Sequence, residues 1–218
     1  MRQVRIVGSE EIFPLGKIVC IGRNYADHIR ELGNEVPERP IFFMKPASSV
    51  IGEGEEIVIP DYSDDCHHEA ELALLIGRTG KNVVASEALS MIAGYGVAID
   101  LTLRDVQSQQ KSKGLPWEIA KGFDTACPLS DFVAAAVVCD PHNLTISLTV
   151  NGELRQNAST ALMLRPIPQL IAEISAIFTL EAGDIILTGT PAGVSRLQSG
   201  DQISAAISEV GCLNVTVA

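Results

Sequence analysis

The 218-residue sequence lacks the marks of several protein classes. No apolar run approaches the roughly 20 residues of a membrane-spanning helix, and the longest covers only residues 132–139. The first residues lack a continuous apolar stretch and a small-residue cleavage site, so we expect no signal peptide and a cytoplasmic protein. Sixteen Lys and Arg against 27 Asp and Glu give a net charge of −11. This disfavours nucleic acids and anionic membranes as partners, because both bind basic surfaces.

Other absences narrow the chemistry. The five cysteines are scattered and never form a Cys-x-x-Cys pair, which argues against a disulfide framework or a structural zinc site. The sequence also has no Gly-x-Ser-x-Gly elbow, no phosphate-binding P-loop, no His-Glu-x-x-His helix and no Gly-x-Gly-x-x-Gly turn. An anionic substrate would therefore need clustered Lys and Arg residues or a bound metal to overcome the negative charge of the chain.

What the sequence does contain is a series of short, β-branched segments bounded by Gly or Pro, which predict strands. These segments are residues 17–22, 41–45, 56–60, 71–77, 95–100, 184–189 and 202–208. A hairpin is predicted in LTISLTVNGELRQ, because the pair Asn151-Gly152 suits a type I′ turn. No repeat and no low-complexity linker divides the chain, so we expect one domain over residues 1–218.

Helices are predicted at residues 24–33, 102–114 and 166–178. The first begins with Asn24 as an expected cap and ends at a glycine, and the third carries its apolar residues on one face. Strands outnumber helices and do not alternate with them regularly. The pattern therefore favours an α+β, mainly β, fold over a doubly wound parallel sheet.

Two glutamates stand directly before an apolar strand in HHEAELALLIG. Residues two apart in a strand point to the same side, so Glu69 and Glu71 would project together. Asp100 ends the apolar strand GYGVAID. Three carboxylates without a nearby cysteine suit Mg²⁺ or Mn²⁺, while His67 and His68 could add ligands for a softer metal. The alternative left open by the spacing is a solvent-exposed edge strand, with the aspartate capping the next helix.

Three further features are candidates for acid–base or charge-stabilising roles. On a helix, His28 and Glu31 are neighbours, and a carboxylate that orients an imidazole prepares a base. Lys121 lies in a segment punctuated by Gly and Pro, where it could meet an oxyanion. The amides of TGTPAG and the Thr190 hydroxyl could bind a carboxylate. The corresponding alternatives are an exposed ion pair, a surface lysine and an ordinary turn.

Taken together and in order, several motifs resemble the fumarylacetoacetate hydrolase family. They are GRNYADH with the following Glu31, HHEAELALLIG, GYGVAIDLTLRDVQ, KGLPWEIAKGFD, VNGELRQ and GDIILTGTPAGV. The likeness is greatest to the compact branch with acylpyruvate hydrolases and oxaloacetate-processing enzymes. It implies a mixed β-sandwich roll of the fumarylacetoacetate hydrolase C-terminal type with short peripheral helices, usually a homodimer. Residues 17–218 would form this core, and residues 1–16 an N-terminal extension.

The resemblance also implies roles for individual residues. Mg²⁺ or Mn²⁺ would be held by the acids at the positions Glu69, Glu71 and Asp100. His28 and Glu31 would lie on a short helix that closes over the substrate, and Lys121 would stabilise negative charge. The positions expected around the substrate are Arg23, Arg104, Gln107 and Thr190. One departure is Ser195, which stands where the family's motif leads us to expect glycine.

These parts predict a divalent-metal-dependent hydrolase that cleaves a carbon–carbon bond in 2,4-dioxo acids of the acylpyruvate type and releases pyruvate. The substrate would chelate the metal through its carboxylate and 2-oxo oxygens, so the cation would draw an anion into this acidic protein, and His28 would deprotonate the attacking water. The alternatives are an oxaloacetate decarboxylase, an enol–keto tautomerase, and an isomerase or hydrolase of aromatic-ring catabolism. Outside enzymes, the alternative is a metal-dependent protein that binds 2-oxo acids without turnover.

Overall fold

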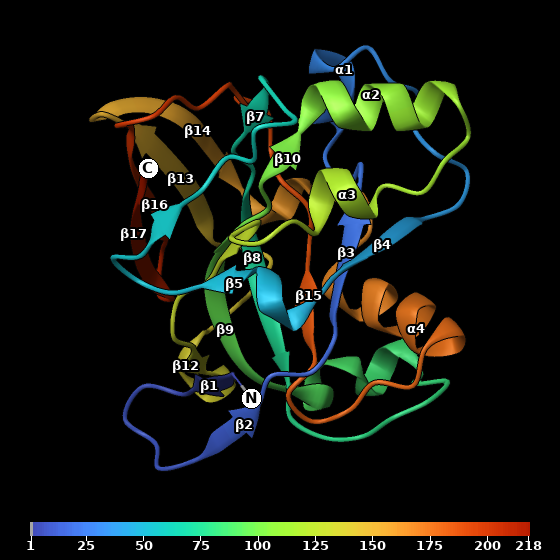
Figure 1. The fold of residues 1–218 in the computed structure, drawn as a ribbon. Coiled ribbons are helices and arrows are strands. Elements are labelled where there is room, and N and C mark those ends of the chain that lie inside the picture. Colours follow the sequence, from blue (N-terminus) through green and yellow to red (C-terminus); the bar gives the residue numbers. More distant parts are fainter. Residues whose placement is uncertain (1) are drawn as a thin grey trace.

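A computed structural model describes residues 2–218 as two packed β-sheets with short helices around them (Figure 1). The larger sheet contains β3 (Ile18–Gly22), β4 (Ile41–Lys45), β8 (Ala70–Ile76), β9 (Ile92–Ile99), β12 (Val133–Ala134) and β15 (Ile185–Leu187). The smaller contains β6 (Glu56–Ile57), β13 (Thr145–Val150), β14 (Glu153–Ser159), β16 (Gln202–Ile207) and β17 (Gly211–Val217). Their orders are β12-β9-β8-β15-β3-β4 and β14-β13-β16-β17-β6. The predicted mainly β, α+β sandwich is confirmed.

Both sheets mix the two strand directions. In the larger sheet β15 pairs in parallel with β3 and antiparallel with β8, and in the smaller sheet β17 pairs in parallel with β6. Three short pairs lie outside them: β1 (Gln3–Arg5) with β2 (Ile12–Pro14), β5 (Val50–Ile51) with β11 (Cys127–Pro128), and β7 (Cys66–His67) with β10 (Thr102–Leu103). The β1–β2 hairpin packs on the outer face of the larger sheet, because Val4 and Phe13 share a cluster with Ile18 and Leu75.

The helices are short and peripheral. They are α1 (Ala26–Glu31), α2 (Arg104–Ser112), α3 (Glu118–Lys121) and α4 (Ile167–Ile177), with 3₁₀ turns η1 (Ala47–Ser49), η2 (Ala85–Met91), η3 (Ala135–Val137) and η4 (Thr160–Leu162). Figure 1 shows α1, α2 and α3 gathered at one end of the larger sheet, with α4 on the opposite side near η2. Within residues 2–218, no helix has both the length and the apolar composition needed to cross a bilayer.

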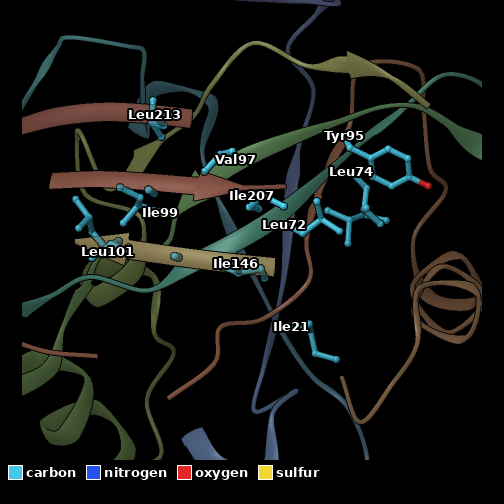
Figure 2. Close-up of a cluster of buried hydrophobic side chains, with 14 of the residues drawn as sticks. Ile21, Leu72, Leu74, Tyr95, Val97, Ile99, Leu101, Ile146, Ile207 and Leu213 are labelled. Atoms are coloured by element: carbon cyan, nitrogen blue, oxygen red, sulfur yellow. The ribbon is translucent and has the colours of Figure 1, made fainter. Parts of the chain in front are cut away.

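The main core lies between the two sheets. Leu72 of β8 and Val97 of β9 face Ile146 of β13 and Ile207 of β16, and all four side chains are buried (Figure 2). Each such aliphatic side chain contributes about 1.5–3 kcal/mol by leaving water. The other face of β8, with Ala73 and Leu75, packs in the cluster that contains Val4 and Phe13, so every residue of β8 is buried. A strand covered on both faces needs an uninterrupted apolar sequence, which explains the run that follows Glu71.

The predicted elements are found close to their expected bounds, except that the strand predicted at residues 56–60 covers only Glu56–Ile57 (β6). The hairpin turn has positive φ at Asn151 (52°) and Gly152 (79°), as a type I′ turn requires. The predicted Asn24 cap is wrong: Tyr25 precedes the first turn of α1, and no side chain caps it. Asn24 is buried instead, and its amide donates to the carbonyl oxygens of Thr188 (2.9 Å) and Arg165 (3.1 Å). This asparagine therefore ties the start of α1 to two distant loops.

Candidate metal centre and active site

Three carboxylates meet where β8 begins and β9 ends. These strands are antiparallel neighbours with Ala70 opposite Ile99, so Glu69 and Asp100 lie side by side, and the Asp100 amide donates to the Glu69 carbonyl at 2.8 Å. One carboxylate oxygen from each of Glu69, Glu71 and Asp100 lies within 4.8 Å of the others. All three are buried and β8 is central in its sheet, which excludes the exposed edge strand. Asp100 caps no helix, because Leu103 precedes α2.

Cationic side chains approach two of these carboxylates from α2, α3 and β4. Lys121 Nζ lies 2.8 Å from Glu69 Oε2 and 2.7 Å from Asp100 Oδ2. Arg104 pairs with the other oxygen of Glu69, and Lys45 Nζ lies 2.8 Å from Asp100 Oδ1. Lys121 and Lys45 are buried, so the surface-lysine alternative for Lys121 is excluded. Each of these carboxylates is thus held between two cations.

Glu71 is held differently. Its Oε2 accepts a hydrogen bond of 2.6 Å from the Gly189 amide, and no described cationic side chain pairs with it. Burial raises the pKa of Glu71 well above its usual range, and the charges of Asp100 and Glu69 raise it further. In Glu69, Lys121 and Arg104 overcome burial and hold the pKa well below its usual range. A hard divalent cation beside Glu71 would supply the missing positive charge, so the oxygen-donor set fits Mg²⁺ or Mn²⁺.

Gly189 places the amide that binds Glu71. It follows β15, where the chain turns away from the sheet with φ of 93° at this residue. A Cβ here would lie 2.7 Å from the Asn24 Cβ, so only glycine fits both the backbone angle and the space. The buried asparagine and the TGTPAG loop therefore position the carboxylate together.

His28 and Glu31 lie on α1, at the side of the carboxylate cluster. His28 Nδ1 is 3.4 Å from Glu31 Oε2, and Glu31 Oε1 accepts from the Gly193 amide at 3.0 Å. Only 6% of His28 is exposed, whereas Glu31 remains accessible to solvent, so the pair is not the wholly exposed one of the alternative. Burial lowers the pKa of His28 below its ordinary value, so the ring is neutral near pH 7. With Nδ1 held by the glutamate, Nε2 is the nitrogen available as a base.

One cavity of about 190 Å³ collects these groups. Its lining includes nine of the residues predicted from the sequence: Arg23, His28, Glu69, Glu71, Asp100, Arg104, Gln107, Lys121 and Thr190. Glu31 is not in the lining and contacts the cavity through His28. Lining residues that the sequence did not single out include Asn34, Lys111 and Trp117, and Lys45 lies just behind Asp100. No spacing signalled them, because they come from separate segments.

A second group of cations lines the same cavity. Arg23 and Lys111 both donate to Asn34 Oδ1, at 2.8 and 3.1 Å, and neither has an acidic partner among the described residues. Burial lowers the pKa of Lys111, and the neighbouring charges of Arg23 and Arg104 lower it further. Arg23 has a positive φ of 62° where the chain leaves β3. The cavity therefore pairs an acidic end with a basic end that lacks a carboxylate.

Thr190 and His68 do not make the contacts considered from the sequence, which were a substrate carboxylate for the Thr190 hydroxyl and a metal for His68. The Thr190 hydroxyl donates to the Ala70 carbonyl at 2.8 Å, so its proton is not available to a ligand. His68 is fully buried between Gln156 and Ser195, and its two ring nitrogens contact these residues and neither glutamate carboxylate. Burial lowers the pKa of His68 to about 4, so it is neutral. The unexpected Ser195 has a defined contact, since its Oγ lies 2.8 Å from His68 Nε2.

The sequence profile of one protein family, fumarylacetoacetate (FAA) hydrolase C-terminal, matches residues 17–218. The chain belongs to this family. The resemblance of the motifs is therefore confirmed.

Curated members of the fumarylacetoacetate hydrolase family are similar over most of this chain. Oxaloacetate tautomerase YcgM of Escherichia coli (strain K12) is 52% identical over 193 residues, which cover 88% of each chain. The mitochondrial oxaloacetate tautomerase FAHD1 of Arabidopsis thaliana is 50% identical over 192 residues, covering 88% of this chain and 86% of that protein. Among solved structures, the fumarylpyruvate hydrolase of Pseudomonas aeruginosa in complex with Mn²⁺ and pyruvate superimposes with a TM-score of 0.96. It is 36% identical, and the match covers 100% of this chain and 95% of that one.

Proposed function

We propose that the cavity is the active site of a divalent-metal-dependent enzyme that interconverts the enol and keto forms of a small 2-oxo dicarboxylate such as oxaloacetate. The observation that carries the proposal is the basic end of the cavity. Among residues 2–218, Arg23 and Lys111 have no acidic partner there, and a second substrate carboxylate would supply one. An acylpyruvate such as acetylpyruvate has only one carboxylate and would leave these cations unpaired. Oxaloacetate tautomerases at about 50% identity agree with this choice.

The metal would be held by Glu69, Glu71 and Asp100. When bound, it would polarise the 2-oxo group and the adjacent carboxylate and would stabilise negative charge on the oxygen of the enolate. The three carboxylates come from adjacent strand ends and are buried, so their positions are set before a ligand arrives. Pre-positioned charges of this kind lower the barrier because little has to reorganise during the reaction.

The chain's own groups then move the proton. His28, neutral and oriented by Glu31, would take the proton of the enol hydroxyl through Nε2 and return it to C3, as the hydroxyl electron pair forms the carbonyl. Lys121 would face the developing oxyanion: its ammonium has three donors, and two of them bind Glu69 and Asp100. Carbon skeletons stay intact in this reaction, and no water is consumed.

Hydrolysis of a carbon–carbon bond in a dioxo acid is the second candidate. The specific observation in its favour is the His28–Glu31 pair, which is also the arrangement that deprotonates a water. The similar structure from Pseudomonas aeruginosa is a fumarylpyruvate hydrolase. The two candidates use the same groups and differ in whether water attacks the substrate.

One experiment separates them. Purified protein with Mg²⁺ or Mn²⁺ is given oxaloacetate, and enol absorbance, pyruvate and carbon dioxide are followed together. Acetylpyruvate, with one carboxylate, and fumarylpyruvate, with two, are tested in parallel. The proposal predicts rapid enol–keto equilibration of oxaloacetate without carbon dioxide release. Pyruvate release from fumarylpyruvate or acetylpyruvate without tautomerisation of oxaloacetate would instead establish the hydrolase. Pyruvate and carbon dioxide from oxaloacetate would identify the decarboxylase.

The basic end of the cavity has its own test. Replacing Lys111 by Met removes one charge-assisted hydrogen bond to the distal carboxylate, worth about 1.5–3 kcal/mol. We expect KM for oxaloacetate to rise about 10- to 100-fold with kcat nearly unchanged. Lys113→Met is the matched control, because Lys113 is exposed and does not line the cavity. Equal KM values for the two variants would show that the distal carboxylate does not bind there.

The homodimer is a further proposal, which rests on the resemblance to the family, and the cytoplasmic location is a proposal as well. Light scattering coupled to size-exclusion chromatography measures the first. Cell fractionation measures the second.

A further inference from the structure

The ladder of hydrogen bonds on one side of β8 is completed by side chains. β15 pairs with β8 only from Ala73 to Leu75, and beyond Leu187 the chain turns into the TGTPAG loop. Backbone groups of β8 nearer the carboxylates thus lose their strand partner, although buried N–H and C=O groups need one. The Leu72 carbonyl accepts from the Thr188 amide and hydroxyl, at 3.2 and 2.9 Å. At Ala70, both groups bind side chains.

Ala70 is the residue between the two glutamates. Gln156 binds its backbone amide directly and its backbone carbonyl through Thr190. The Ala70 amide donates to Gln156 Oε1 at 3.0 Å, and the Ala70 carbonyl accepts from the Thr190 hydroxyl at 2.8 Å. Thr190 Oγ1 in turn accepts from Gln156 Nε2 at 2.8 Å. A peptide amide can only donate and the Pro191 carbonyl, 2.9 Å from Nε2, can only accept, so the orientation of the Gln156 amide is unambiguous.

The chain of hydrogen bonds continues to His68 and Ser195. Gln156 Oε1 can only accept, so His68 Nδ1, at 3.1 Å, carries the proton, and Nε2 must accept from the Ser195 hydroxyl at 2.8 Å. Every bond therefore runs in one direction, from Ser195 through His68, Gln156 and Thr190 to the Ala70 carbonyl. A chain with all donors and acceptors satisfied holds its members in a single arrangement.

The position of Gln156 in the fold is unusual. It lies on β14, the edge strand of the smaller sheet, and it is the only fully buried residue of that strand. The β13–β14 register shifts at the adjacent Arg155, which is left without a partner on β13. The TGTPAG loop packs closely against this bulge, because a Cβ at Gly193 would lie 2.0 Å from the Arg155 carbonyl oxygen. The bulge turns a polar side chain inward, toward the peptide that joins the two glutamates.

We propose that Gln156, held by His68, is a positioning residue that fixes the Glu69–Ala70–Glu71 backbone, so that both carboxylates face one cation. It touches neither the cavity nor the carboxylates, and it acts through Ala70 and Thr190. The inference rests on the proposed metal centre and does not depend on which reaction follows metal binding. Outer partners of metal ligands commonly change metal affinity 10- to 100-fold, and we expect an effect of that size.

The test combines metal affinity with a measurement on the metal-free protein. Mn²⁺ binding is measured by calorimetry, and hydrogen exchange of the Ala70 amide is measured by NMR after chelation. Gln156→Met keeps the length of the side chain and removes every hydrogen bond. We expect Mn²⁺ affinity to fall 10- to 100-fold and Ala70 exchange to accelerate by at least tenfold. A second pair of variants changes His68: His68→Leu removes the donor to Gln156, and His68→Asn retains one at the position of Nδ1.

The matched control is Thr160→Val. Thr160 is fully buried just beyond β14, and its hydroxyl accepts from the Leu144 amide at 2.9 Å, remote from the carboxylates. This variant should lower Tm and leave Mn²⁺ affinity within twofold of the natural protein. If His68→Leu weakens Mn²⁺ binding and His68→Asn restores it, a purely structural role is excluded, since both variants disturb the same buried site.

Three outcomes would overturn the inference: Mn²⁺ affinity within twofold of the natural value in Gln156→Met, an equal loss in Thr160→Val, or no difference between the two His68 variants. If Gln156→Met does not fold, the His68 pair is decisive by the same criteria. If the natural protein itself binds no Mn²⁺, the proposed metal centre is wrong. In that case Ala70 exchange alone decides whether Gln156 fixes this backbone.

Discussion

Replacing Lys45 by methionine should destabilise the protein markedly, although this lysine does not line the cavity. Its Nζ is buried 2.8 Å from Asp100 Oδ1. It also donates to three carbonyl oxygens, those of Leu101 (3.2 Å), Ala126 (2.9 Å) and Lys121. These carbonyls belong to the residue after Asp100, to the last residue of α3 and to the segment that follows α3, so one ammonium group joins β4 to the backbone around Asp100 and Lys121.

The size of the effect follows from what remains after the substitution. Removing one partner of a buried ion pair costs about 3–5 kcal/mol, because the other charge stays buried. Asp100 keeps Lys121 at 2.7 Å from its second oxygen, so we expect the lower end, about 3 kcal/mol. For a chain of this length 1 kcal/mol corresponds to about 2–4 °C, which predicts a fall in Tm of about 6–12 °C. Methionine fills a similar volume, so a cavity adds little.

The assay is urea unfolding of the metal-free protein, followed by circular dichroism, with a thermal scan on the same samples. Lys113→Met serves as the control, because Lys113 is exposed and substitutions at such positions change stability by about 0.5 kcal/mol or less. A loss below about 1 kcal/mol in Lys45→Met would refute the reasoning. It would mean that Asp100 needs no second cation in the folded protein.

Two further predictions concern the carboxylates and the base. Glu71→Ala should abolish Mn²⁺ binding in equilibrium dialysis and reduce turnover to background. Glu87 is exposed, so the control variant Glu87→Ala should leave Mn²⁺ binding and turnover intact. If Glu71→Ala still bound Mn²⁺, Glu71 would not be a metal ligand. Burial lowers the pKa of His28, so its neutral form persists below pH 6.5 and activity should fall only as the pH drops through that lowered value. His28→Gln should lower kcat at least 100-fold, remove this acid limb from the pH–rate profile and spare metal binding. The control variant His142→Gln should leave the acid limb in place. An unchanged acid limb in His28→Gln would exclude His28 as the base.

The strands and helices were largely predictable because they depend on local patterns. The alternation of apolar residues, the glycines and prolines between segments, and the Asn151-Gly152 turn each act over a few residues. The N-terminal hairpin, α3 and β17 were not predicted. β17 does carry a strand pattern, because Leu213, Val215 and Val217 alternate with polar residues and are buried, and this pattern was missed. The hairpin and α3 are short segments with weak patterns of their own, and the hairpin forms because the larger sheet offers a surface to Val4 and Phe13.

The candidate site divides in the same way. Local patterns singled out seven of the site residues, and the resemblance added Arg23, Arg104 and Gln107. Nine of these ten line the cavity, and their individual roles stay predictions. Neither the patterns nor the resemblance selected Lys45, Lys111 or Gln156. A lysine or glutamine that becomes buried has the same appearance in a sequence as one that stays in solvent, since only its neighbours distinguish the two.

By itself, the sequence determined that Glu69 and Glu71 share one side of a strand, because a strand repeats every two residues. It also placed His28 and Glu31 on one side of a helical turn. The sequence also named Asp100 as a third carboxylate and Lys121 as a charge-stabilising lysine, but only the tertiary structure decided that they meet the glutamates. It alone decided that Lys45 lies beside Asp100 and that Gln156 reaches Ala70 from the other sheet. The reason is that these contacts join segments far apart in the chain, and strand order and packing set their distances.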